Sequence, residues 1–203
     1  MPPQNRREFL KLGGVMTAAL AGQGLMHAAP TSPSAPLLST AADVANAAMP
    51  TRNLGKTGRR VSIFGLGGQA ALERWNNEAV AVPLIERALD LGVNYLDTSS
   101  IYGGEKRWSE KYYGQVLKKR RAEAFLASKT KERTRDASLR MLEKSLELLQ
   151  TDHLDLWMLH DIGTTGDIAE VFAKGGAMEA LIEARDQKMV RHLGLTGHHR
   201  PDC

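Results

Sequence analysis

The chain has 203 residues, of which 42% are hydrophobic and 25% are charged, a composition that excludes disorder along its whole length. Its single cysteine, Cys203, excludes an intramolecular disulfide and a thiolate metal cluster. The formal net charge is +4, but lysine and arginine alternate with glutamate and aspartate along the helical stretches, so the charge pattern argues against nucleic-acid binding.

The first fifty residues differ in composition from the rest of the chain. Residues 1–29 contain the pair Arg6 and Arg7 followed by a weakly apolar segment, which resembles a twin-arginine export signal. The apolar segment is too interrupted to predict a stable membrane span. Residues 30–50 are rich in proline, serine, threonine and alanine, and predict a disordered linker.

This N-terminal pattern predicts the twin-arginine export machinery as a partner. The expected location is periplasmic or otherwise exported, and cytoplasmic if the signal is not used. The alternative interpretation is a disordered tail in which two arginines are adjacent by chance.

From residue 51 the sequence predicts a polar hairpin and then alternating strands and helices. The helices show apolar residues at three- and four-residue steps, as in Leu139, Leu142, Leu146 and Leu149. Alternation of this kind predicts parallel pairing with right-handed crossovers. The expected strands are residues 61–64, 93–96, 124–127, 154–159 and 190–195, and the expected helices are residues 78–91, 109–119 with Ser109 as cap, 134–150 and 177–187.

Four polar side chains, Asp97, Tyr102, Lys129 and His160, follow successive predicted strands. The carboxyl ends of parallel strands in a (β/α) barrel meet at one mouth, so we expect these side chains to converge. Taken singly, each has an ordinary alternative: a turn cap, a surface aromatic, a solvated lysine or a core histidine with its hydrogen bonds satisfied.

The residues around this set resemble the core motifs of the aldo-keto reductases. The matching segments are residues 94–102, 127–130 and 154–160, and the resemblance extends over residues 51–200. It implies an α/β fold, the (β/α)8 TIM barrel. Since only five of eight strands are recognisable, we expect residues 51–203 to be a partial barrel, truncated after about the fifth strand. This implies a fragment of a longer protein or an interrupted reading frame, with a compact variant of the barrel as the alternative.

The resemblance also implies a function: an NAD(P)H-dependent oxidoreductase that reduces an aldehyde, ketone or sugar-like carbonyl. By this resemblance Tyr102 donates the proton, Lys129 lowers its pKa and is itself held charged and oriented by Asp97, and His160 hydrogen-bonds the small-molecule substrate. The alternatives are a catalytically silent nucleotide-binding or interaction protein, or an inert truncated product.

The implied cofactor is NADP, with NAD as the alternative. The candidate cofactor-binding residues are Gly67, Gly68, Asp97 and Thr196, the last standing where many family members have a Ser-Asn pair. We expect no metal site, because His192, His198 and His199 do not form a known metal-binding motif.

Overall fold

The computed structural model describes residues 48–198. The expected export signal in residues 1–29 and nearly all of the expected linker, residues 30–50, lie outside the described residues. Among the described residues, no helix combines the length and the apolar character that crossing a membrane requires.

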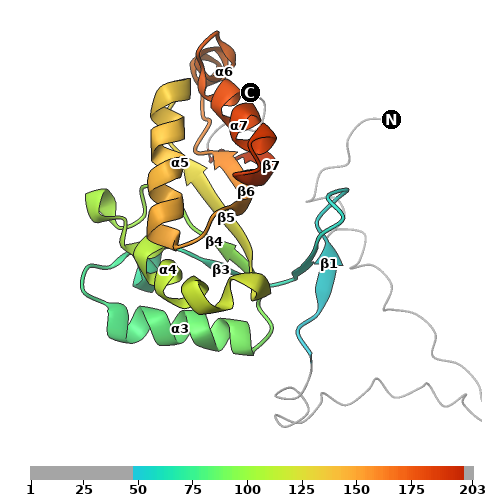
Figure 1. Ribbon diagram of the computed structural model, residues 1–203, viewed down its shortest axis with the longest axis vertical. Helices are drawn as coiled ribbons and strands as arrows, with labels where there is room; N and C mark the ends of the chain where they lie inside the picture. Colours follow the sequence, from blue (N-terminus) through green and yellow to red (C-terminus); the bar gives the residue numbers. More distant parts are fainter. Residues whose placement is uncertain (1–47, 199–203) are drawn as a thin grey trace, which may run out of the picture. The chain divides into compact units, whose positions relative to one another are not determined.

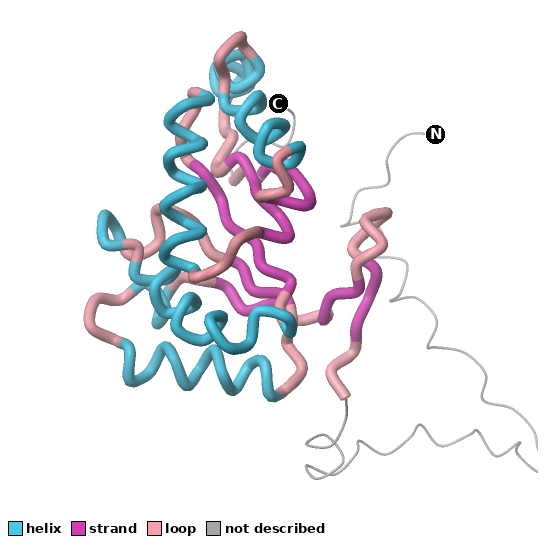
Figure 2. The backbone as a smooth tube through the Cα atoms, viewed as in Figure 1, coloured by secondary structure: helices cyan, strands magenta, loops and turns pink. Residues whose placement is uncertain are grey.

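A five-stranded parallel sheet forms the centre of the described part, with its strands side by side in sequence order. Four helices pack along one side of it, each against the next, as Figures 1 and 2 show. The strands are β3 (Gly65–Gly67), β4 (Tyr95–Asp97), β5 (Phe125–Thr130), β6 (Leu154–Leu159) and β7 (Val190–Leu195), and these helices are α3 (Glu78–Asp90), α4 (Trp108–Arg120), α5 (Arg135–Leu149) and α7 (Ala177–Asp186). This confirms the predicted α/β class and corresponds to five units of a (β/α)8 barrel.

Alternation along the strands separates the core from the candidate site. Leu96, Leu126 and Trp157 are buried in the same hydrophobic cluster as Tyr113 and Leu142 of the helices. Side chains of neighbouring positions in a strand point to opposite faces. Asp97, one position after Leu96, and Lys129, three positions after Leu126, therefore lie on the face away from the helices.

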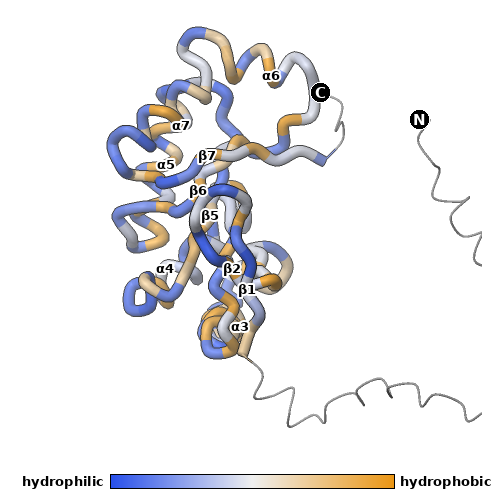
Figure 3. The backbone as a smooth tube through the Cα atoms, turned by 90° about the vertical axis from the view of Figure 1, so that its right-hand side faces the viewer, coloured by the Kyte–Doolittle hydropathy of each residue, from blue (hydrophilic) through white to orange (hydrophobic). Residues whose placement is uncertain are grey.

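The remaining short elements connect or flank the sheet. They are the antiparallel hairpin of β1 (Thr51–Asn53) and β2 (Arg60–Ser62), the 3₁₀ turns η1 (Ala70–Glu73), η2 (Gly104–Lys106) and η3 (Arg121–Glu123), and helix α6 (Thr165–Phe172). The hairpin turn is hydrophilic, blue in Figure 3.

The predicted first barrel strand, residues 61–64, is wrong. Val61 and Ser62 belong to the second strand of the hairpin, whereas Ile63 and Phe64 are 59% and 60% exposed. The first barrel strand is Gly65–Gly67, which pairs in parallel with β4. It carries a single large apolar side chain, so its sequence gives no strand pattern of its own.

Two helix predictions also need correction. Helix α4 begins at Trp108, after Arg107, which has a left-handed backbone with φ of 53°. Ser109 is therefore inside the helix, and its hydroxyl pairs with that of Thr98 at 2.8 Å instead of capping. Helix α6 was not predicted, although Thr164 and Asp167 form a capping box at its start.

Candidate active site

An ion pair between Asp97 and Lys129 occupies the carboxyl ends of β4 and β5. The ammonium Nζ donates to both carboxylate oxygens of Asp97, at 2.7 and 2.8 Å, and to the carbonyl oxygen of Thr98 at 2.9 Å. The Lys129 side chain is 5% exposed and that of Asp97 is 30% exposed. Burial raises the pKa of Asp97, and the Lys129 charge offsets part of that rise.

Tyr102 lies on the loop that follows β4, above this ion pair. The loop continues the pairing with β5 through Thr98 N–H to Ala127 O at 2.9 Å and Ser100 N–H to Lys129 O at 3.2 Å, and then turns back. Lys129 Nζ lies 5.1 Å from the centre of the Tyr102 ring. The strand pairing therefore places the phenol next to the ammonium.

The pKa of Tyr102 moves in the direction opposite to the expected one. Burial raises the pKa of Tyr102, and the negative charges of Asp97 and Glu73 raise it further. The sequence-based expectation was that Lys129 lowers this pKa. Within the chain, Asp97 balances the Lys129 charge, so the phenol stays protonated and remains a proton donor.

His160 follows β6 and completes the set. Its ring meets that of Tyr102 edge to face, with centroids 5.7 Å apart and planes at 84°. Burial, with the positive charge of Lys129 as the next cause, lowers the pKa of His160 to about 4. The imidazole is therefore neutral at neutral pH. The structure thus brings Asp97, Tyr102, Lys129 and His160 together.

Sequence reasoning missed Ser99 as a residue of this site. Its hydroxyl is buried and lies 2.9 Å from Nδ1 of His160. A partner on one ring nitrogen fixes the proton on the imidazole, and so decides what the other nitrogen offers to a substrate. The one signal for Ser99 in the sequence was its place between Asp97 and Tyr102.

The three other predicted site residues lie at the ends of the outer strands. Gly67 is in register with Asp97, and a Cβ atom at Gly67 would meet nothing within 4 Å. At Gly68 a Cβ would lie 2.4 Å from Ser109 Oγ, so packing alone explains that glycine. Thr196 accepts the Asp161 N–H at 3.1 Å through its hydroxyl oxygen, which leaves its proton free to donate.

No group of three His, Cys, Asp or Glu side chains that could hold a metal ion occurs in residues 48–198. His192 stacks on Phe125 with ring centroids 6.3 Å apart, and His198 is exposed. His199 lies outside the described residues.

A buried polar cluster behind the site was also missed by sequence reasoning. Glu110 accepts a hydrogen bond from Ser128 Oγ at 2.9 Å and pairs with Arg107 at 2.8 Å. Arg107 also donates to Ser145 and to the Met141 carbonyl of α5. Burial raises the pKa of Glu110, while the Arg107 charge partly offsets the rise. The cluster joins α4, α5 and β5.

Comparison with known proteins identifies the family of this chain. The profile of the aldo/keto reductase family matches residues 63–201. The chain belongs to the aldo/keto reductase family. It is 32% identical over 161 residues to L-galactose dehydrogenase of Arabidopsis thaliana, covering 72% of this chain and 48% of that protein.

Solved structures of the family share its fold. Aldo-keto reductase AKR11C1 from Bacillus halodurans, in its holo form, superposes with a TM-score of 0.62 at 30% identity, over 73% of this chain and 50% of that one. An aldo-keto reductase from Klebsiella pneumoniae in complex with NADPH gives 0.59 at 26% identity, over 68% and 46%. The chain spans about half the length of these relatives.

Proposed function

We propose that the protein is an NAD(P)H-dependent oxidoreductase that reduces an aldehyde, ketone or sugar-like carbonyl. The observation that carries the proposal is the convergence of Tyr102, Lys129, Asp97 and His160 at the ends of consecutive parallel strands. Membership of the aldo/keto reductase family supports the same reaction class.

Each residue has a role that follows from its surroundings. Tyr102 keeps its proton at neutral pH and donates it to the oxygen of the carbonyl. Neutral His160, held at Nδ1 by Ser99, hydrogen-bonds that oxygen through its other nitrogen. Lys129, held by Asp97, supplies a fixed positive charge beside the phenol as negative charge develops there.

The described residues fit the nicotinamide end of the cofactor. Gly67 leaves open space beside Asp97, and Thr196 has a hydroxyl proton to donate. These residues, with Asp97, would hold the nicotinamide, and the cofactor would supply the hydride for the carbonyl carbon. A family structure in complex with NADPH supports this assignment, with NADP as the first choice and NAD as the alternative.

The test is carbonyl reduction by the full chain and by its Tyr102→Phe variant. NADPH oxidation is followed over a panel of aldehydes, ketones and sugars. Loss of the phenolic proton donor should lower kcat by about 10²- to 10⁴-fold, whereas NADPH binding, measured by fluorescence, should be retained. Binding without turnover in the parent chain would instead favour a catalytically silent nucleotide-binding protein.

We also propose that residues 1–29 direct export through the twin-arginine machinery. The observation is the Arg6–Arg7 pair ahead of an apolar segment. Replacing both arginines by lysine keeps the charge and should retain the protein in the cytoplasm, as measured by cell fractionation. An unchanged location would refute this proposal.

A further inference from the structure

Asp161, the residue directly after His160, has a strained backbone. Its φ is 57°, in the left-handed region that residues with a side chain adopt rarely. A residue in this conformation persists only where the surrounding structure holds it, and such residues gather at functional sites. Because Asp161 follows His160 directly, the contacts that hold this turn also hold the backbone from which the imidazole extends.

Arg133 holds this turn from the loop that follows β5. Its Nη1 donates to the carbonyl oxygen of His160 at 3.1 Å, and its Nη2 donates to the carbonyl oxygen of Asp161 at 3.0 Å. One planar guanidinium thus reaches two consecutive carbonyls, a geometry that the ammonium of a lysine does not reproduce. Nη1 also donates to the carbonyl of Lys131 at 3.2 Å, so the same group joins the His160 turn to the loop after β5.

The guanidinium of Arg133 is itself held in place. The side chain is 14% exposed, and its Nε donates to a carboxylate oxygen of Asp167 at 3.2 Å. Asp167 belongs to the capping box that begins α6, together with Thr164. The backbone carbonyl of Arg133 accepts the Ala177 N–H at 2.8 Å, at the start of α7. Both ends of the arginine are therefore fixed before it contacts the turn.

Ser99 and Arg133 hold His160 at two different points. Ser99 Oγ lies 2.9 Å from Nδ1 of the ring, whereas Arg133 holds the carbonyl of the same residue. The His160 N–H donates to the Thr130 carbonyl at 2.8 Å, next to the end of β6. With the backbone and one ring nitrogen held, the second ring nitrogen has a defined direction in which to meet a substrate.

We propose that Arg133 is a positioning residue of the active site. It holds the strained turn at Asp161 and thereby keeps the imidazole of His160 where its second ring nitrogen reaches the substrate oxygen. This inference rests on the proposed function of His160 in carbonyl reduction. Arg133 acts through His160, and its own bonds go to the two loops and to α6.

The first experiment compares the full chain with its Arg133→Ala variant. The variant removes the donors to both carbonyls, so the turn relaxes and the imidazole moves. Displacement of a catalytic group by about 1 Å can cost about 10²-fold in rate, and we expect kcat for NADPH-dependent carbonyl reduction to fall about 10- to 10²-fold. NADPH binding, measured by fluorescence, should be retained.

NMR measures the position of His160 independently of turnover. The ¹⁵N signals of its ring, assigned by their absence in His160→Gln, should shift in Arg133→Ala because the bond to Ser99 is disturbed. Arg133→Lys keeps the positive charge but cannot donate to both carbonyls, so it should show the same changes to a smaller extent. If Arg133→Ala does not fold, the lysine variant decides by the same two measurements.

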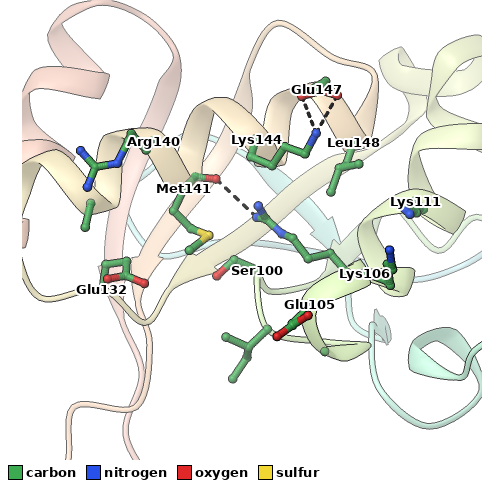
Figure 4. A pocket seen from close by; sticks show the side chains of 14 residues that line it. Ser100, Glu105, Lys106, Lys111, Glu132, Arg140, Met141, Lys144, Glu147 and Leu148 are labelled. Atoms are coloured by element: carbon green, nitrogen blue, oxygen red, sulfur yellow. Dashed lines mark hydrogen bonds and ion pairs between the residues drawn. The ribbon is translucent and has the colours of Figure 1, made fainter.

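Two control variants separate position from charge and from stability. Arg140→Ala removes an exposed arginine of α5, which Figure 4 shows beside a pocket that none of the four proposed catalytic residues lines. It should change neither kcat nor the His160 signals. Thr164→Ala removes the capping box of α6 and should lower the free energy of unfolding in urea, but it leaves the bonds from Arg133 to the two carbonyls. It should therefore leave the His160 ring signals unchanged.

The outcomes for the proposed function and for this inference are distinct. If the parent chain reduces no carbonyl, the proposed function fails, and the His160 ring signals alone decide whether Arg133 positions the imidazole. Unchanged ring signals in a folded Arg133 variant would overturn the inference, and so would equal changes in Thr164→Ala. In a parent chain that is active, an unchanged kcat in the Arg133 variant would also overturn it.

Discussion

The buried Asp97–Lys129 pair gives the sharpest stability prediction. Asp97→Asn keeps the size of the side chain but removes the negative charge from a lysine that is 5% exposed and has both carboxylate oxygens within 2.8 Å. Breaking a buried pair from one side costs about 3–5 kcal/mol. Asp97 is 30% exposed, so water relieves part of this cost, and we expect the free energy of unfolding to fall by about 2–3 kcal/mol.

Urea unfolding of the full chain, followed by tryptophan fluorescence, measures this loss. The double variant Asp97→Asn/Lys129→Met removes the unpaired charge and should be more stable than Asp97→Asn alone. The control is Asp90→Asn, which breaks an exposed pair with Arg120 and should leave stability nearly unchanged. Equal losses for Asp97→Asn and Asp90→Asn, or a double variant no more stable than the single one, would refute the reasoning.

Three further predictions concern neighbouring residues. Gly68→Ala should lower the free energy of unfolding, measured by urea unfolding, by about 1–3 kcal/mol, because the added Cβ meets Ser109 Oγ. Gly67→Ala is the control, since its Cβ has open space and should not lower the free energy of unfolding. Similar losses in the two variants would contradict the packing argument. The pKa of His160 is lowered from 6.5 to about 4, so the unfolded chain takes up this proton first and stability should fall as pH drops through that range. Thermal melts of His160→Gln should show a weaker decline there, and identical slopes would count against a neutral buried imidazole. Ser99→Ala should change the ¹⁵N shift of His160 Nδ1, whereas Ser100→Ala should not; an unchanged shift in Ser99→Ala would remove Ser99 as a positioning residue.

The accuracy of the sequence-based fold prediction followed the strength of the local pattern. The strands Leu154–Leu159 and Val190–Leu195, in which apolar residues recur, were predicted with the observed bounds. The first barrel strand, Gly65–Gly67, has no such pattern, and the apolar residues before it belong to the hairpin and to an exposed connection. Its strand character comes from pairing with β4, which sequence periodicity does not show.

The residues of the candidate site also separate into those that the sequence could predict and those that it could not. Asp97, Tyr102, Lys129 and His160 were predicted because each follows a strand, and parallel pairing brings such positions together. Ser99 could not be assigned, because its role depends on a hydrogen bond across 61 residues of sequence. The direction of the Tyr102 pKa was predicted wrongly, since burial and the balance between two neighbouring charges are properties of the fold.

Strand β5 connects the two sides of the sheet. Lys129 faces the candidate active site, while the preceding residue, Ser128, faces the helices and donates to buried Glu110. Glu110 is held by Arg107, which also fixes α5 through Ser145. Since neighbouring positions of one strand share a rigid backbone, the polar cluster under the helices helps to hold the part of β5 that carries Lys129.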